Sequence, residues 1–127
     1  MDNKFDVVIV GTGAAGLYAA LNFPESVNIL LVSKRELQLS NSSLAQGGVA
    51  CVLDTVHDSY KLHITDTLIA GKYKNTLSAV EKLVTEGPSD VLKIKDLGVD
   101  FDLNEDGTMC KTLEAGHSRN RIVHHKD

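Results

Sequence analysis

Two short apolar runs frame the first part of the chain. Residues 5–10 read Phe-Asp-Val-Val-Ile-Val and residues 27–32 read Val-Asn-Ile-Leu-Leu-Val. Runs rich in β-branched residues predict strands that are buried on both faces, as in a parallel sheet. Between them, residues 17–23 are expected to form a helix that stops before Pro24. The pattern therefore predicts a right-handed βαβ unit.

The rest of the chain alternates helical periodicity with turn signals. Apolar residues recur at helical spacing in residues 58–72 and 76–86. Gly87 and Pro88 are expected to end the second of these helices, and a third helix then runs to a C-cap at Gly98. Two further features are expected, a short strand over residues 49–53 and a hairpin formed by residues 99–103 and 108–112.

Composition and charge narrow the class of protein. Hydrophobic residues make up 43% of the 127 residues and charged residues 24%, which is typical of a soluble globular protein. The net charge of −4 argues against a nucleic-acid partner. The longest apolar run is too short to span a membrane, and the N-terminus lacks the pattern of a signal peptide. Cys51 and Cys110 lack metal-ligand spacing, so we expect small core residues in a cytoplasmic protein.

A glycine-rich turn follows the first predicted strand directly and opens the first predicted helix. In the G-x-G-x-x-G pattern, Gly11 is expected to permit a tight turn, Gly13 to let a diphosphate approach the backbone, and Gly16 to let helix and strand pack closely. The N–H groups at the helix start then face the phosphates. The predicted cofactor-binding residues of this turn are Gly11, Thr12, Gly13, Ala14, Ala15 and Gly16.

The end of the second predicted strand departs from the simple NAD-binding pattern. It carries Ser33 and Lys34 where a ribose-binding carboxylate is usual, and the next acidic residue is Glu36. We include Ser33 and Lys34 among the cofactor-binding residues, with an ordinary solvated lysine as the alternative for Lys34. This departure disfavours an NAD-linked dehydrogenase.

Three segments carry a family resemblance. Residues 41–50 read N-S-S-L-A-Q-G-G-V-A, residues 66–71 read D-T-L-I-A-G, and residues 114–122 read E-A-G-H-S-R-N-R-I. Together they resemble the succinate dehydrogenase/fumarate reductase flavoprotein family, and most of all its aspartate-oxidising branch. The resemblance implies that the loop contacts FAD, with residues 45–48 near the isoalloxazine. Its implied cofactor-binding residues are Asn41, Ser42, Ser43, Leu44, Ala45, Gln46, Gly47 and Gly48.

The departures from the family pattern are informative. Many members attach the flavin to a histidine that precedes the loop motif, but the equivalent position here is Asn41, so FAD is expected to bind non-covalently. Glu114 is the candidate substrate-binding residue, because an α-ammonium group needs a carboxylate partner; a surface glutamate is the equal alternative. Ala115 replaces a glycine, which matters only if its φ is positive.

Arg119 and Arg121 have three open roles, which are to bind the flavin diphosphate, a substrate carboxylate, or solvent. The resemblance places the catalytic base outside this chain, and we assign none. No metal site is expected, because His117, His124 and His125 lack ligand spacing.

The resemblance also implies the fold and the function. The fold class is α/β, the N-terminal part of a Rossmann-type FAD-binding domain with a parallel sheet over residues 1–127, with capping and C-terminal helical domains outside this chain. The implied activity is FAD-dependent oxidation of L-aspartate to iminoaspartate in de novo NAD synthesis, with oxygen or fumarate as acceptor. A fragment of this kind is expected to be inactive alone and prone to self-association. The alternatives are a fumarate reductase or succinate dehydrogenase flavoprotein subunit and a non-catalytic nucleotide-binding module.

Overall fold

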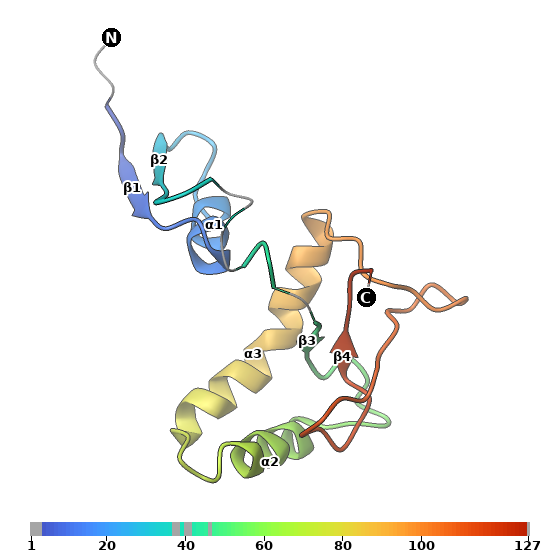
Figure 1. Cartoon of the computed structure of the whole chain (residues 1–127). Coiled ribbons are helices and arrows are strands. Elements are labelled where there is room, and N and C mark those ends of the chain that lie inside the picture. Colours follow the sequence, from blue (N-terminus) through green and yellow to red (C-terminus); the bar gives the residue numbers. More distant parts are fainter. Residues whose placement is uncertain (1–3, 37–38, 40–41, 46, 127) are drawn as a thin grey trace. The chain divides into compact units, whose positions relative to one another are not determined.

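The computed structural model describes residues 4–36, 39, 42–45 and 47–126. The chain divides into two compact units, an N-terminal unit of residues 1–46 and a C-terminal unit of residues 47–127. Figure 1 shows the elements of both units along the chain. Among the described residues, no helix combines the length and the apolar character that crossing a membrane requires.

The N-terminal unit is the βαβ motif that the apolar runs predict. Strands β1 (Val7–Val10) and β2 (Ile29–Val32) pair in parallel, and helix α1 (Ala14–Leu21) connects them (Figure 1). The prediction of an α/β fold with a parallel sheet is therefore confirmed. Helix α1 begins earlier than expected, because Gly13 serves as its N-cap and the end of the glycine turn is already helical.

Two helices form one side of the C-terminal unit, α2 (Tyr60–Ala70) and α3 (Leu77–Asp96), and they pack against each other. Helix α2 begins two residues later than its pattern predicts, because Ser59 is its N-cap and the Ser59 side chain accepts a hydrogen bond of 3.2 Å from the Leu62 N–H. It ends at Gly71.

Helix α3 corrects the prediction that Gly87 and Pro88 separate two helices. A single helix of 20 residues runs through both, although a proline inside a helix costs about 3 kcal/mol. Val80, Val84, Pro88 and Val91 are buried along this helix. Because burial of each valine side chain contributes about 1.5–3 kcal/mol, the buried residues outweigh the local loss at the proline.

Strand β3 (Val49–Ala50) is shorter than the strand predicted over residues 49–53. It pairs antiparallel with β4 (Ile122–Val123), a strand that the apolar pattern does not predict. This pairing joins the two ends of the C-terminal unit (Figure 1).

The predicted hairpin is reduced to one isolated bridge, between Leu103 and Met109. The backbone beside it pairs with the region of β4 instead. Thr112 bridges to Ile122, and the Asp102 N–H donates a 2.9 Å hydrogen bond to the carbonyl of His124. The turn was predicted correctly, but the two strands of the hairpin were not.

The core of the C-terminal unit brings together residues from the two ends of that unit and from α3 and the segment that follows it. Its buried members are Cys51, Val91, Phe101, Met109 and Val123, with Leu53 packed against them. Burial raises the pKa of the Cys51 thiol to about 11, against a smaller opposing effect of the Lys111 charge. Cys51 is thus a core residue, as expected.

Candidate functional site

The glycine turn has the geometry that its spacing predicts. Gly11 has a φ of +107°, a conformation that side chains rarely adopt. A Cβ added at Gly16 would lie 2.0 Å from the Gly11 carbonyl oxygen and 3.4 Å from Cγ2 of Ile9. The glycine at position 16 is therefore what lets α1 pack against β1.

The first backbone N–H of α1 is bonded to the hydroxyl oxygen of an exposed serine, Ser42. Gly13 offers no side chain for capping, and the Ala14 N–H donates a 3.0 Å hydrogen bond to Oγ of Ser42. A Cβ at Gly13 would meet that same oxygen at 3.2 Å. The partial positive charge at a helix N-terminus favours acceptors and anions, so the serine oxygen occupies the kind of position that a phosphate oxygen prefers.

A pocket of about 380 Å³ lies beside this turn. It is lined by Gly11, Thr12, Gly13, Ser33, Lys34, Arg35, Glu36 and Leu39. The buried Thr12 hydroxyl donates to Oγ of Ser33 at 2.9 Å, and the Gly11 N–H donates to the Val32 carbonyl at 2.8 Å. These bonds hold the turn to the end of β2. The volume lies in the range of ligand pockets, so the residues fit part of a dinucleotide.

Glu36 also lines this pocket, although the sequence pattern did not place it in the site. It lies four residues after the end of β2, where the sequence showed it as the next acidic residue without indicating a role.

The second predicted cofactor loop is described only in part, because Asn41 and Gln46 lie outside the described residues. Gly47 has a φ of +107°. A Cβ at Gly48 would lie 2.2 Å from Cγ2 of Ile122 and 2.7 Å from the Val123 carbonyl oxygen. Glycine at position 48 is thus required by the close approach of β4.

Glu114 lines a separate pocket of about 360 Å³, together with residues that include Thr112 and His124. Its Oε1 lies 3.2 Å from Nε2 of His124, and the Thr112 hydroxyl lies 2.6 Å from the same nitrogen. Nearly half of the Glu114 side chain is exposed, at 47%, so its carboxylate is accessible to a ligand. Ala115 has no positive φ, and its departure from the family pattern introduces no strain; the positive φ of +85° falls on Gly116.

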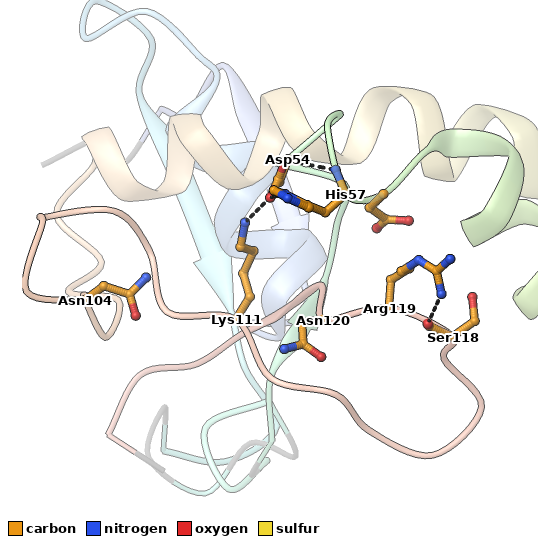
Figure 2. Close-up of a pocket in the computed structure, with 8 residues that line it drawn as sticks. Asp54, His57, Asn104, Lys111, Ser118, Arg119 and Asn120 are labelled. Carbon is orange, nitrogen blue, oxygen red and sulfur yellow. Dashed lines mark hydrogen bonds and ion pairs between the residues drawn. The ribbon is translucent and has the colours of Figure 1, made fainter.

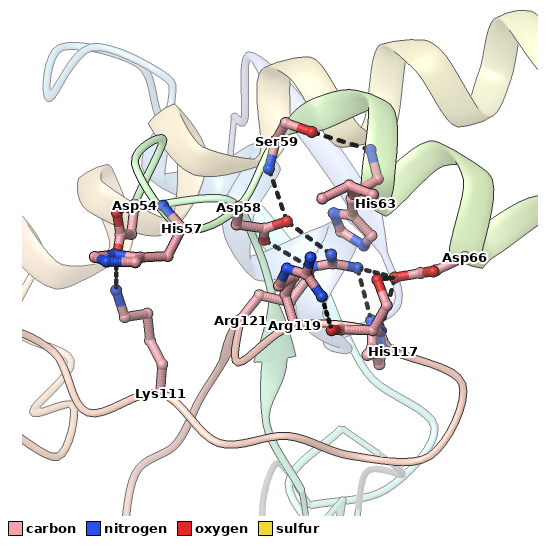
Figure 3. A network of polar contacts seen from close by, with 12 residues as sticks. Asp54, His57, Asp58, Ser59, His63, Asp66, Lys111, His117, Arg119 and Arg121 are labelled. Carbon is pink, nitrogen blue, oxygen red and sulfur yellow. Dashed lines mark hydrogen bonds and ion pairs between the residues drawn. The ribbon is translucent and has the colours of Figure 1, made fainter.

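Arg121 has partners that the sequence did not reveal (Figure 3). Its side chain is fully buried, and its Nε and Nη2 donate to the two carboxylate oxygens of Asp58 at 2.7 and 2.8 Å. Its Nη1 donates to Oδ2 of Asp66 at 2.7 Å. The guanidinium is thus held between two carboxylates within the protein.

The pKa shifts of Asp58, Asp66 and Arg121 agree with these contacts. Burial alone would raise the pKa of Asp58, but hydrogen bonds from Arg121 and the Ser59 N–H, together with the Arg121 charge, hold it below its usual value. Burial likewise opposes ionisation of Asp66, and hydrogen bonds from Ser118 and Arg121 lower its pKa. The two carboxylates raise the pKa of Arg121 against the effect of burial. All three groups are therefore charged at neutral pH.

Two histidines lie at the edge of this ion-pair network (Figure 3). Nδ1 of His117 lies 3.3 Å from Nη1 of Arg121, and the His117 and His63 ring centroids are 5.6 Å apart. His63 is buried, and its Nδ1 has no hydrogen-bond partner among the described residues. Burial, and then the charges of Arg121 and His117, lower the pKa of His63, which keeps this ring neutral.

A third pocket, of about 370 Å³, lies beside the network and contains Arg119 (Figure 2). Arg119 is exposed, and its Nη1 donates to the Ser118 carbonyl at 2.7 Å. Across the pocket, Asp54 accepts from His57 at 2.9 Å and from Lys111 at 3.4 Å. A hydrogen bond from His57 is the largest cause that holds the pKa of Asp54 below its usual range. Arg119, unlike Arg121, keeps its guanidinium accessible.

The sequence pattern missed Asp58, His63 and Asp66. A usable signal was present in the sequence, because His63 and Asp66 lie three residues apart in a predicted helix and therefore share one side of it. In the structure both side chains are largely shielded from solvent. Polar residues on the covered side of a helix mark a buried network or a site.

Comparison with known proteins places this geometry in context. The family described as "FAD binding domain" matches residues 6–127. The L-aspartate oxidase of Clostridium perfringens is 48% identical over 127 residues, which are 100% of this chain and 28% of that protein. The L-aspartate oxidase of a Nostoc species is 45% identical over 125 residues, 98% of this chain and 21% of that protein. The chain thus spans less than a third of these relatives.

Two solved structures are similar in fold. Mycobacterium smegmatis Sdh1, in complex with UQ1, matches with a TM-score of 0.85 and 31% identity, over 94% of this chain and 20% of that chain. The E. coli quinol fumarate reductase FrdA matches with a TM-score of 0.85 and 29% identity, over 94% of this chain and 21% of that chain.

Proposed function

This chain belongs to the FAD binding domain family, and from that premise we propose that it supplies part of the FAD site and part of the substrate site of an L-aspartate oxidase. One observation supports the proposed FAD site. The turn from Gly11 to Gly16 opens α1 without a side-chain cap, beside a pocket lined by Ser33 and Lys34. The similarity to L-aspartate oxidases over the whole chain supports the substrate part.

The N-terminal unit would hold the diphosphate and the ribose of FAD. The backbone N–H groups of Thr12 to Gly16 would bind phosphate oxygens, and Ser42 would give up its place at the Ala14 N–H to one of them. Ser33 and Lys34 would bind the ribose end, where Glu36 adds a carboxylate for ribose hydroxyls. As the resemblance implies, residues 41–48 of the second loop would contact FAD, with residues 45–48 near the isoalloxazine.

The attachment of FAD would be non-covalent. No histidine precedes Gly48 in the sequence, and Asn41 stands at the position of the flavin-linked histidine of related enzymes. Acid precipitation of the holoenzyme should therefore release all of the flavin into the supernatant. Yellow colour retained in the precipitated protein would refute this attachment.

The Glu114 carboxylate would bind the α-ammonium group of L-aspartate. It lines a pocket, it is accessible, and His124 holds it from one side. A carboxylate in contact with a cationic group lowers the cost of taking that group out of water. The redox chemistry would come from bound FAD, as the acceptor of a hydride from Cα of L-aspartate, which would leave iminoaspartate. Oxygen or fumarate would then reoxidise the cofactor, and the residue that moves the substrate proton would lie outside this chain.

A second candidate function is that of a fumarate reductase or succinate dehydrogenase flavoprotein, which the fold similarity to Sdh1 and FrdA favours. Asn41 and Glu114 argue against it. The visible spectrum of the full-length protein without oxygen separates the two. Bleaching of the flavin by L-aspartate but not by succinate is expected, and bleaching by succinate alone would assign the protein to the second candidate.

The role of Glu114 is tested by Glu114→Gln, with Glu105→Gln in the exposed turn of residues 104–108 as the matched control. Loss of a charged partner to a ligand costs about 1.5–3 kcal/mol. We therefore expect KM for L-aspartate to rise at least about tenfold in Glu114→Gln, with the Kd for succinate unchanged. Equal kinetics in the two variants would remove Glu114 from the substrate site.

A further inference from the structure

We propose that Asp66 is a positioning residue for Glu114, because it holds the loop of residues 114–118 against α2. The inference rests on the proposed function, which gives Glu114 its role in binding the α-ammonium group. Asp66 is far from Glu114 in sequence and would act only through the loop. The juxtaposition of Asp66, Ser118 and Arg121 carries this inference, and Figure 3 shows Asp66 beside Arg121.

The loop is tied to Asp66 at its far end. Ser118 donates both its N–H, at 2.9 Å, and its hydroxyl, at 2.8 Å, to the same Oδ2 of Asp66. Within the loop, the His117 N–H donates to the Glu114 carbonyl at 3.1 Å, and Gly116 makes the turn with its positive φ. The backbone of Glu114 is therefore connected to Asp66 through one closed turn and two hydrogen bonds.

Asp66 is itself held in place. It lies on α2, its side chain is only 12% exposed, and its Oδ2 also accepts from Nη1 of Arg121 at 2.7 Å. Arg121 in turn is fixed by its two hydrogen bonds to Asp58. Three donors thus meet at one carboxylate oxygen that cannot change its rotamer without breaking a buried ion pair. This oxygen is a rigid anchor for the loop.

Glu114 is held on its other side by the region of β4. His124 lies next to β4 and contacts both the Glu114 carboxylate and the Thr112 hydroxyl. The carboxylate is therefore located by two separate attachments, His124 at its tip and Asp66 through the loop. A binding group that is fixed in advance by its surroundings loses affinity when either support is removed.

The test uses Ser118→Ala in the full-length protein, because this change removes one of the two hydrogen bonds and leaves the buried ion pair intact. Ser118→Thr keeps the hydroxyl and is the rescue variant. Thr65→Ala is the matched control, since it likewise removes an exposed hydroxyl, which on α2 donates to the Lys61 carbonyl within the same helix. The readouts are kcat and KM for L-aspartate, the Kd of succinate from the flavin spectrum, and hydrogen exchange of the amides of residues 115–118.

In Ser118→Ala we expect KM for L-aspartate to rise about tenfold, the loss typical of one hydrogen bond to a charged group, with kcat and the succinate Kd little changed. Exchange of the loop amides should accelerate in this variant alone. Ser118→Thr and Thr65→Ala should behave as the wild type. Asp66→Asn should give a larger rise in KM. Its kinetics are compared with those of the wild type once the far-UV circular dichroism spectra of the two proteins match.

The inference is overturned if Ser118→Ala matches Thr65→Ala in both KM and loop exchange. It is also overturned if KM and the succinate Kd rise together, which is the pattern of a general structural defect. If Glu114→Gln impairs turnover of L-aspartate while Ser118→Ala does not, the positioning role fails and the proposed function stands. If the wild type does not oxidise L-aspartate, the proposed function fails, and the inference falls with it whatever the exchange result.

Discussion

Replacement of Asp58 by asparagine removes one charge from the buried network around Arg121 while it keeps the side-chain volume. The new amide group would place N–H donors against the N–H donors of Arg121, whose guanidinium is fully buried. Removal of one partner from a buried ion pair costs about 3–5 kcal/mol. Because Asp66 still compensates part of the charge, we expect the lower end of this range, about 3 kcal/mol.

Equilibrium unfolding in urea measures this loss in the full-length protein. At a slope of about 3 kcal/mol per molar urea, the expected loss lowers the midpoint by about 1 M. Asp96→Asn is the matched control, since Asp96 is exposed at the end of α3. It should leave the midpoint almost unchanged, because a surface substitution usually changes the free energy of unfolding by less than about 0.5 kcal/mol.

A double-mutant cycle with Arg121→Gln then separates the ion pair from other effects of the Asp58 substitution. If the two groups interact as the structure shows, Asp58→Asn should cost much less in the Arg121→Gln background. An equal loss of unfolding free energy in both backgrounds would refute the reasoning. It would mean that the contribution of Asp58 to stability does not depend on Arg121. A wild-type midpoint for Asp58→Asn would refute it as well.

Two further predictions concern the glycine turn and the buried histidine. Gly16→Ala places a methyl group 2.0 Å from the Gly11 carbonyl oxygen and should abolish flavin retention on gel filtration, whereas Gly87→Ala, with nothing within 4 Å, should retain it. His63 has a lowered pKa in the folded protein and therefore binds a proton more readily in the unfolded chain. Stability should accordingly fall as the pH drops below about 6.5, by at most about 1.4 kcal/mol per pH unit. His63→Gln should flatten this slope in thermal melts between pH 7.5 and 5.5, and an unchanged slope would show that other groups cause it.

The features that were predicted correctly from the sequence depend on local signals. The apolar runs predicted β1 and β2, and the glycine spacing predicted the turn between β1 and α1, because each pattern reports on neighbouring residues. The prediction of FAD as cofactor, made from family resemblance, is confirmed by the family match over residues 6–127. Non-covalent attachment and the role of Glu114 remain predictions.

The features that were missed depend on partners distant in sequence. Pro88 is a strong local signal for a helix end, yet α3 continues through it because buried valines on both sides pack into the unit. None of the three roles left open for Arg121 was an ion pair within the protein, and its partner Asp58 lies 63 residues away. No periodicity reports such a pairing, and β4 is too short to produce a pattern of its own.

The pairing of β3 with β4 has a consequence for the order of events on the ribosome. β3 emerges early, but its partner is made about seventy residues later, which takes several seconds at about 5–20 residues per second. The same late segment contains Val123, which completes the core, and Arg121, which neutralises Asp58 and Asp66. During that interval the α2–α3 pair can form from local contacts alone, while β3 waits with an unpaired edge. Nascent chains that stop short of Arg121 should therefore be the ones that chaperones hold and proteases remove.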